Sequence, residues 1–152
     1  MAKKKSARQK AWDAFSRYIR HRDCLLTTGD TDYGICCTCG NTFPFERLQA
    51  GHFIPGRNNA ILFDTRGVNA QCVGCNMYAN GRQPKYHEWM MEHHGQEVID
   101  ELFHRARQNA HFKPYHYEDF IQTFKAWDNT ILSGSLPDEE VFLEELQEII
   151  GG

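Results

Sequence analysis

The sequence predicts an α+β fold: a small cysteine-clamped core of two strands and one helix, with further helices before and after it. Two Cys-x-x-Cys pairs bracket a strand-like segment that ends in His52. Apolar residues recur at helical spacing on both sides of that region. The chain of 152 residues is long enough for one such domain with helical additions.

Composition excludes several classes of protein. A hydrophobic content of 41% and an aromatic content of 12% exclude a wholly disordered chain. No apolar run approaches the roughly 20 residues that span a bilayer, and Met1–Lys10 is too basic and polar for a signal segment. We therefore expect a cytoplasmic protein with no membrane partner. In that compartment thiols stay reduced, and paired cysteines bind metal more often than each other.

The first segment, residues 1–35, is predicted to be a basic helix followed by a loop. Residues 3–23 place apolar side chains at helical spacing, and Arg17 and Arg20 lie mostly off that stripe. These arginines belong either to a solvated helix face or to a surface that binds nucleic-acid backbone. The basic charge of this segment contrasts with an acidic tail, which keeps the chain soluble or meets a partner.

The second segment, residues 36–82, is predicted to hold the core. Leu48–His52 reads as one strand, and the apolar run at residues 61–63 reads as a second. Glycine, proline and asparagine at residues 55–59 indicate the turn between them, so the two runs predict a hairpin with a wide loop. Residues 72–78 read as the start of a helix.

The third segment, residues 83–152, is predicted to be helical. Apolar side chains recur at helical spacing within residues 84–94, 98–106, 120–131 and 141–150. These stripes are typical of a core or of a partner surface, and they give no sign of a cofactor site.

The two cysteine pairs predict a structural zinc site. Zinc is held tetrahedrally by four thiolate or imidazole ligands in such sites, and the pairs supply four thiolates: Cys36, Cys39, Cys72 and Cys75. Gly40 gives the first pair the backbone freedom for a tight turn. Disulfides or unrelated core cysteines are the alternatives. Cys24 and Cys37 are left over as small buried residues, although Cys37 could compete as a ligand.

His52 and Asn76 are the candidate catalytic residues. A histidine beside a glycine is often structural, but His52 lies inside the cysteine-clamped hairpin, and Asn76 follows the last cysteine directly. A histidine with a pKa near neutrality can take a proton from an attacking water. The amide oxygen of Asn76 suits Mg²⁺ that keeps several of its waters, and Mn²⁺ is a possible substitute. This layout indicates phosphodiester hydrolysis assisted by a cation.

The stretch L-Q-A-G-H-F-I-P-G-R, together with Q-C-x-x-C-N, resembles the NinG (Rap) family of lambdoid phage recombination proteins. That family belongs to the HNH, or His-Me finger, nucleases, and its zinc-plus-histidine layout is similar to phage endonuclease VII. The resemblance runs from Asp23 to Glu101. It implies a ββα-metal core and a structure-specific endonuclease that hydrolyses branched DNA, such as Holliday junctions, in the host cytoplasm.

Carried over by position, the two cysteine pairs are the zinc ligands, His52 is the general base and Asn76 binds the catalytic cation. Two positions depart from the family pattern. Many HNH enzymes have an aspartate before the histidine, where this chain has Gly51; Asp64 is a candidate for the missing carboxylate. The asparagine that orients the histidine is replaced by glycine at position 67, so Asn69 becomes the candidate for that role.

Other functional expectations concern DNA and protein partners. Arg57 beside His52 and Arg82 after the helix start are candidates for binding the scissile strand, while Arg17 and Arg20 would grip flanking duplex. Self-association as a homodimer and contacts with phage or host recombination proteins are further expectations. Two rival functions are a zinc-stabilised DNA-binding protein without cleavage activity, and an HNH nuclease that selects a sequence.

Overall fold

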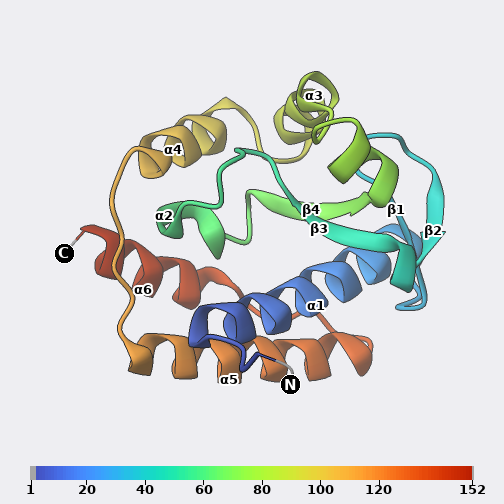
Figure 1. Ribbon diagram of the computed structural model, residues 1–152. Coiled ribbons are helices and arrows are strands. Elements are labelled where there is room, and N and C mark those ends of the chain that lie inside the picture. The colour runs from blue at the N-terminus through green and yellow to red at the C-terminus, as the bar shows by residue number, and fades with distance from the viewer. Residues whose placement is uncertain (1–2, 152) are drawn as a thin grey trace.

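The computed structural model describes residues 3–151. Residues 1–2 and 152, which belong to the first and third predicted segments, lie outside the described residues. The first helix, α1 (Ala7–Thr28), begins at Ser6, whose hydroxyl caps Gln9 N, and ends at Gly29 in the left-handed conformation. It is therefore a turn longer at its C-terminal end than the sequence predicted. Figure 1 shows α1 lying between the central strands and the helix α5 (Pro114–Leu132).

The segment expected to be a loop before the first cysteine pair contains a strand. β1 (Tyr33–Ile35) pairs antiparallel with β2 (Thr42–Pro44), and the first Cys-x-x-Cys turn connects them. A short helical turn, η1 (Phe45–Arg47), leads on into the central hairpin. Strands of three residues carry too little alternation to be recognised from sequence.

The central hairpin pairs β3 (Leu48–His52) with β4 (Val68–Cys72) in antiparallel register, with His52 opposite Val68. β3 was predicted correctly. The prediction of a second strand at residues 61–63 was wrong, because most of that run lies in a short helix, α2 (Asn59–Leu62). The Asn58 side chain accepts a hydrogen bond from Ala60 N and starts that helix.

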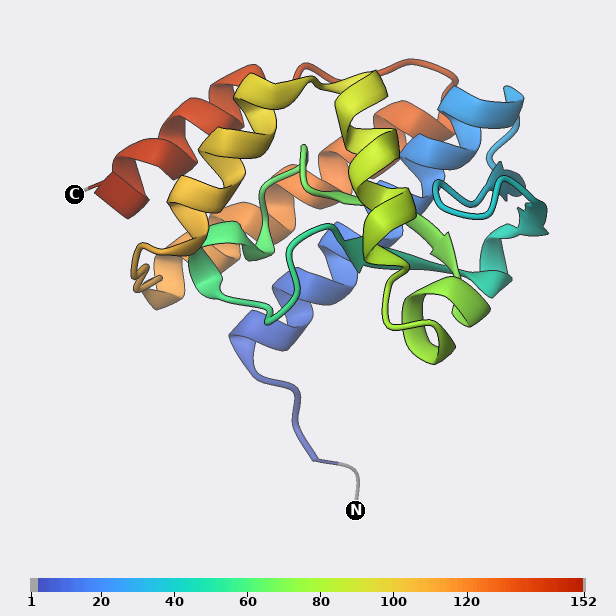
Figure 2. The same ribbon diagram turned by 90° about the horizontal axis from the view of Figure 1, so that it is seen from above.

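The remaining helices cover both faces of the hairpin. One wide helical turn, η2 (Gly74–Tyr78), follows β4 and is succeeded by α3 (Gln83–His93) and α4 (Gln96–Ala106). Figures 1 and 2 show α3 and α4 on the side of the hairpin opposite α1 and α5. The last described element is α6 (Glu140–Gly151), so residues 83–151 are mainly helical.

One apolar core joins the N-terminal, central and C-terminal segments. Its buried members come from α1, the central hairpin, α2, α5 and α6, and include Phe15, Leu62, Val68, Phe124 and Leu146. The three predicted segments therefore share a core. A smaller cluster lies between the hairpin and helices α3 and α4. Among the helices within residues 3–151, none has the length and apolar character to cross a membrane.

A buried ionic network fixes the hairpin on α1. The Arg22 guanidinium donates to the Val68 carbonyl at 3.0 Å and pairs with Asp23 at 2.8 Å and with Glu139 at 3.2 Å. The Asp23 carboxylate also accepts a hydrogen bond from Ala70 N at 2.7 Å. Arg22 and Asp23 both belong to α1 and both contact β4. The network therefore sets the position of the hairpin over that helix.

Candidate metal centre and adjoining cleft

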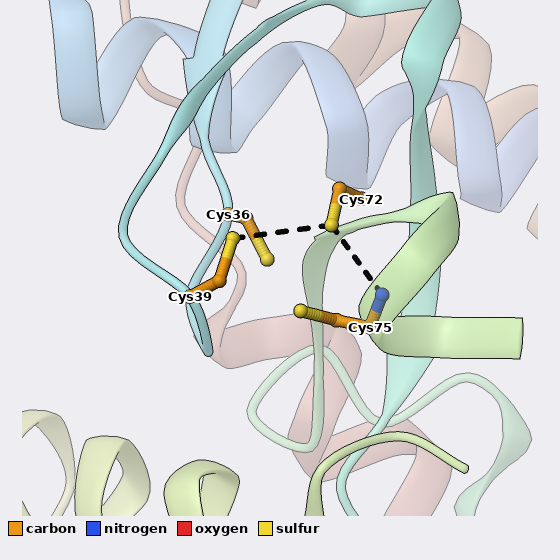
Figure 3. A group of neighbouring side chains, drawn as sticks. All are labelled: Cys36, Cys39, Cys72 and Cys75. Carbon is orange, nitrogen blue, oxygen red and sulfur yellow. Dashed lines mark hydrogen bonds between the residues drawn. The ribbon is translucent and has the colours of Figure 1, made fainter. Parts of the chain in front are cut away.

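The four cysteines of the two pairs converge on one point. Their sulfur atoms all lie within 4.8 Å of one another, and the Cys39 and Cys72 sulfurs are 3.9 Å apart. Figure 3 shows the four side chains pointing toward one another. Cys36 and Cys39 flank the turn between β1 and β2, while Cys72 ends β4 and Cys75 lies in η2. The cluster therefore joins three separate elements.

The local backbone explains how these sulfurs meet. Gly40 N donates to the Cys36 carbonyl at 3.0 Å, and Gly40 has φ +75°, a conformation that glycine adopts at little cost. Zinc–sulfur bonds of about 2.3 Å place tetrahedral thiolates about 3.8 Å apart, close to the Cys39–Cys72 separation. The donor set and its spacing are thus compatible with a structural zinc site.

The electrostatics of the cluster favour a bound cation. Burial raises the pKa of Cys36, but hydrogen bonds from Thr38 and from backbone amides outweigh it and bring the pKa to about 6. Burial raises the pKa of Cys72 to about 12. Four thiols so close together lose their protons together only beside a positive ion, which is what a zinc ion supplies.

The two leftover cysteines lie outside the cluster. Cys24 is buried beside Leu48 and Ala70, and burial raises the pKa of its thiol to about 12. Cys37 packs against the smaller apolar cluster, which includes Tyr86 and Met90 of α3. Burial raises the pKa of its thiol as well. The prediction of a small buried residue is confirmed for Cys24, whereas Cys37 is only partly buried.

A cleft of about 690 Å³ adjoins the cysteine cluster through Asn76, which lines it and directly follows Cys75. It brings together several of the predicted site residues and several that the sequence did not single out, the main ones being Trp12, Arg20, Gln49, His52, Arg57 and Asn76. The cleft therefore places the candidate base, the candidate cation ligand and two arginines on one surface.

His52 is held at the end of β3 by a backbone hydrogen bond. Its Nε2 lies 3.2 Å from the Leu62 carbonyl oxygen, which can only accept, so Nε2 carries the proton and Nδ1 is left as an acceptor. Burial, together with the positive charges of Arg57 and Arg8, lowers the pKa of His52 to about 4, although the hydrogen bond to the Leu62 carbonyl opposes this shift. The imidazole is consequently neutral at pH 7.

Trp12 forms the other support of His52. The two rings stack at 5.1 Å with an interplanar angle of 19°, and the Arg57 guanidinium lies over the Trp12 ring at 4.7 Å. Arg57 also accepts a hydrogen bond at its carbonyl from Arg8 at 2.7 Å. The sequence showed Trp12 beside the apolar stripe of the first helix, but the contact with His52 depends on how the hairpin sits on α1.

Asn76 lies in η2, directly after Cys75, and lines the cleft. Its Nδ2 donates to Gln49 Oε1 at 2.8 Å, which leaves its Oδ1 turned away from that bond. An amide held in this way presents an oxygen that a divalent cation can bind. The position of Asn76 depends on the cysteine cluster, because Cys75 fixes the preceding backbone.

The other predicted arginines are distributed unevenly. Arg20 lines the cleft and lies over the Phe45 ring at 4.4 Å. Arg17 is exposed on α1 and pairs with Asp128 at 3.3 Å. Arg82 is exposed at the start of α3, outside the lining of the cleft. The cleft therefore brings Arg20 and Arg57 to the candidate base, but not Arg17 or Arg82.

Two candidates from the sequence have other roles. Asn69 is buried opposite Gly51 and hydrogen-bonds Arg22 and Tyr86, so the expectation that it orients His52 was wrong. The Leu62 carbonyl does so instead, and a backbone oxygen leaves no signal in a sequence.

Asp64 was the candidate for the missing carboxylate ligand. Its side chain is fully buried and pairs with Arg105 at 2.6 Å and with Arg66 at 3.0 Å. Both of these contacts fall on Oδ2, and Oδ1 accepts a hydrogen bond from Arg66 Nε at 3.1 Å. Both oxygens are thus engaged with guanidinium groups that do not line the cleft, so this expectation was also wrong. The carboxylate has a structural role between the hairpin loop and α4.

Comparison with known proteins agrees with the sequence resemblance. A family model described as Bacteriophage Lambda NinG protein matches residues 1–131. Protein ninG of Escherichia phage 933W is 31% identical over 107 residues, which cover 68% of this chain and 46% of that protein. Protein ninG of Escherichia phage lambda is 30% identical over the same coverage, and that of Salmonella phage P22 is 31% identical over 98 residues, 62% of this chain and 42% of that protein.

The chain thus spans a little under half the length of these curated relatives. No solved structure matches the chain.

Proposed function

The chain belongs to the NinG family of phage proteins, and from that premise and the cleft we propose that it is a metal-dependent DNA endonuclease of the HNH type that hydrolyses phosphodiester bonds. One observation carries the proposal: a neutral His52, with Nδ1 as its acceptor, lines the same cleft as the amide of Asn76. A general base and a cation ligand at one surface are what phosphodiester hydrolysis requires.

His52 would act as the general base. Nδ1 accepts a proton from a water whose oxygen attacks phosphorus, and the bond from phosphorus to the leaving oxygen breaks. The hydrogen bond from Nε2 to the Leu62 carbonyl keeps the imidazole in the required tautomer. Stacking on Trp12 holds the ring plane, so the base needs little rearrangement when DNA binds.

Two kinds of metal site fit the residues. The four clustered cysteines would hold a structural zinc ion that joins the β1–β2 turn to β4 and η2. Asn76 Oδ1 would bind Mg²⁺ or Mn²⁺, which when bound stabilises negative charge on the phosphate and on the leaving oxygen. Since Asn76 follows Cys75, the zinc site would also fix the residue that binds the catalytic cation.

The cleft has groups suited to a DNA backbone. Arg57 and Arg20 lie along it with His52, where they would bind phosphates on either side of the scissile bond. Arg17 and the lysines before α1 would contact flanking duplex without reading its sequence. The preference for branched DNA in recombination, such as Holliday junctions, rests on the resemblance to HNH junction nucleases, as do action as a homodimer and in the host cytoplasm with recombination proteins.

One observation favours a rival function, a zinc-stabilised DNA-binding protein that does not cleave. Gly51 leaves the position before the histidine without a carboxylate, and Asp64 does not replace it. The cleft also fits a nuclease selective for a sequence, since phosphate-binding arginines serve either substrate.

Nicking of supercoiled plasmid separates cleavage from mere binding. We expect zinc-loaded protein to nick plasmid with Mg²⁺ or Mn²⁺, and His52→Ala to lose nicking while its circular dichroism is unchanged. His111→Ala, a change of an exposed histidine away from the cleft, is the matched control and should nick normally. DNA binding without nicking under both cations would favour the rival.

A further inference from the structure

We propose that Gln71 supplies the second protein oxygen of the catalytic cation site, in place of the carboxylate that position 51 lacks. The inference rests on the proposed nuclease function and identifies a ligand from β4, the strand opposite the one that carries His52. It starts from the space around Gly51, which the Gln71 side chain fills.

The Gln71 amide oxygen lies where a side chain at position 51 would begin. A Cβ built on Gly51 would come within 1.9 Å of Gln71 Oε1 and within 3.1 Å of Asn76 Oδ1. No side chain at position 51 can coexist with this placement of Gln71. The glycine therefore makes room for an oxygen from the neighbouring strand beside the oxygen of the helical asparagine.

The amide orientation of Gln71 follows from its partners. Its Nε2 lies 3.0 Å from the Gly81 carbonyl oxygen, which can only accept, and 3.1 Å from the Thr38 hydroxyl. The nitrogen must therefore face Gly81, and Oε1 faces Gly51. Gln71 is fully buried, and its Oε1 has no hydrogen-bond partner among residues 3–151. An unmatched buried amide oxygen is costly, which calls for a partner at this place.

A hydrated divalent cation satisfies that requirement. Asn76 Nδ2 is engaged by Gln49, so Asn76 Oδ1 and Gln71 Oε1 are two acceptors close to the same point. Two acceptors cannot hydrogen-bond each other, but both can bind Mg²⁺ or Mn²⁺, which take oxygen ligands and keep waters for the other positions. The surrounding Gln49, Asn76 and Gly81 line the cleft, so the site is next to the proposed path of the phosphate.

Binding of Mn²⁺ to zinc-loaded protein, followed by the electron paramagnetic resonance signal of free Mn²⁺, tests the site without DNA. We expect Gln71→Leu to weaken Mn²⁺ binding by roughly ten-fold or more, at least the effect of losing an outer contact of a metal ligand. Gln71→Glu keeps the side-chain length, adds a negative charge and should bind Mn²⁺ more tightly than wild type. Gln83→Leu, which removes another glutamine from the cleft lining, is the matched control and should leave the affinity unchanged.

Zinc content and circular dichroism accompany each variant, since Gln71 precedes a cysteine of the cluster. Unchanged Mn²⁺ affinity in a folded Gln71→Leu would overturn the inference, because Gln71 would then not be a ligand of the cation. In the wild-type protein Oε1 would instead accept a hydrogen bond from a rotated Asn76 amide. If Gln71→Leu does not fold, an unchanged affinity in Gln71→Glu would overturn it, and so would wild-type protein that binds no Mn²⁺ at millimolar concentration.

Plasmid nicking by wild type, measured in parallel, separates this inference from the proposed function. Nicking together with Mn²⁺ binding that does not depend on Gln71 removes the ligand and leaves the nuclease. Mn²⁺ binding that depends on Gln71 without nicking supports the ligand and removes the nuclease.

Discussion

Replacing Asp64 with asparagine tests whether this carboxylate has a structural role or binds a cation. The change keeps the shape of the side chain and removes its charge, next to Arg105 at 2.6 Å and Arg66 at 3.0 Å. Breaking a buried ion pair by neutralising one partner costs about 3–5 kcal/mol, because the other charge stays buried. Arg66 retains Glu101 at 2.6 Å, whereas Arg105 retains the neutral Gln147, so the loss falls mainly on Arg105.

We therefore expect Asp64→Asn to lose about 3 kcal/mol of unfolding free energy, at the lower end of that range. Urea unfolding of zinc-loaded protein, followed by circular dichroism, measures it. A loss of this size corresponds to a fall in melting temperature of roughly 6–12 °C. Asp119→Asn, a change of an exposed carboxylate on α5, is the control and should fall within about 0.5 kcal/mol of wild type. A loss below about 1 kcal/mol, combined with weaker Mn²⁺ binding, would refute the structural role.

Three further predictions follow from the metal centre and the cleft. Cys72→Ser should lose zinc and unfold at lower urea concentration, whereas Cys24→Ser should keep one zinc per chain by metal analysis; equal zinc content would contradict the cluster. Because the pKa of His52 is lowered to about 4, the imidazole stays neutral as pH falls from 7 to about 5, and kcat/KM should stay nearly constant over this range. A fall in kcat/KM near the ordinary histidine pKa of about 6.5 would exclude His52 as the base. Trp12→Ala exposes the His52 ring to water, so the pKa of His52 should rise toward the ordinary histidine value in an NMR titration. An unchanged pKa of His52 would contradict the role of the stacking, and Trp89→Ala on α3 is the control.

The parts of the fold that the sequence predicted are those with a strong local pattern. The helices α4, α5 and α6 follow from apolar spacing. The cysteine cluster follows from two Cys-x-x-Cys pairs, because two pairs of this spacing can supply the four thiolates of one metal site.

The misassigned strand shows where local pattern fails. β4 alternates apolar and polar residues, but it is only five residues long and all five are buried, including the polar Asn69 and Gln71, so its alternation does not separate a buried face from an exposed one. The second strand was instead predicted at residues 61–63, which are more apolar. Buried polar side chains are recognised through their partners, and those lie far away in sequence.

The sequence predicted the candidate metal ligands and the candidate base, but not the groups that contact them. His52 and Asn76 follow from their positions relative to the cysteines. The Leu62 carbonyl, the Trp12 ring and the Gln71 amide act through tertiary contacts that no local pattern encodes. The missing aspartate at position 51 was visible in the sequence, but the oxygen that fills its place was not.

Cleavage of a synthetic four-way junction, beside linear duplex of the same sequence, tests the central claim most directly. Zinc-loaded wild type and His52→Ala are compared with Mg²⁺ and with a chelator added after zinc loading. The account predicts junction cutting that requires both the divalent cation and His52, with little cutting of the linear duplex. Equal cutting of both substrates would contradict the preference for branched DNA, and binding without cutting under Mg²⁺ and Mn²⁺ would contradict the nuclease itself.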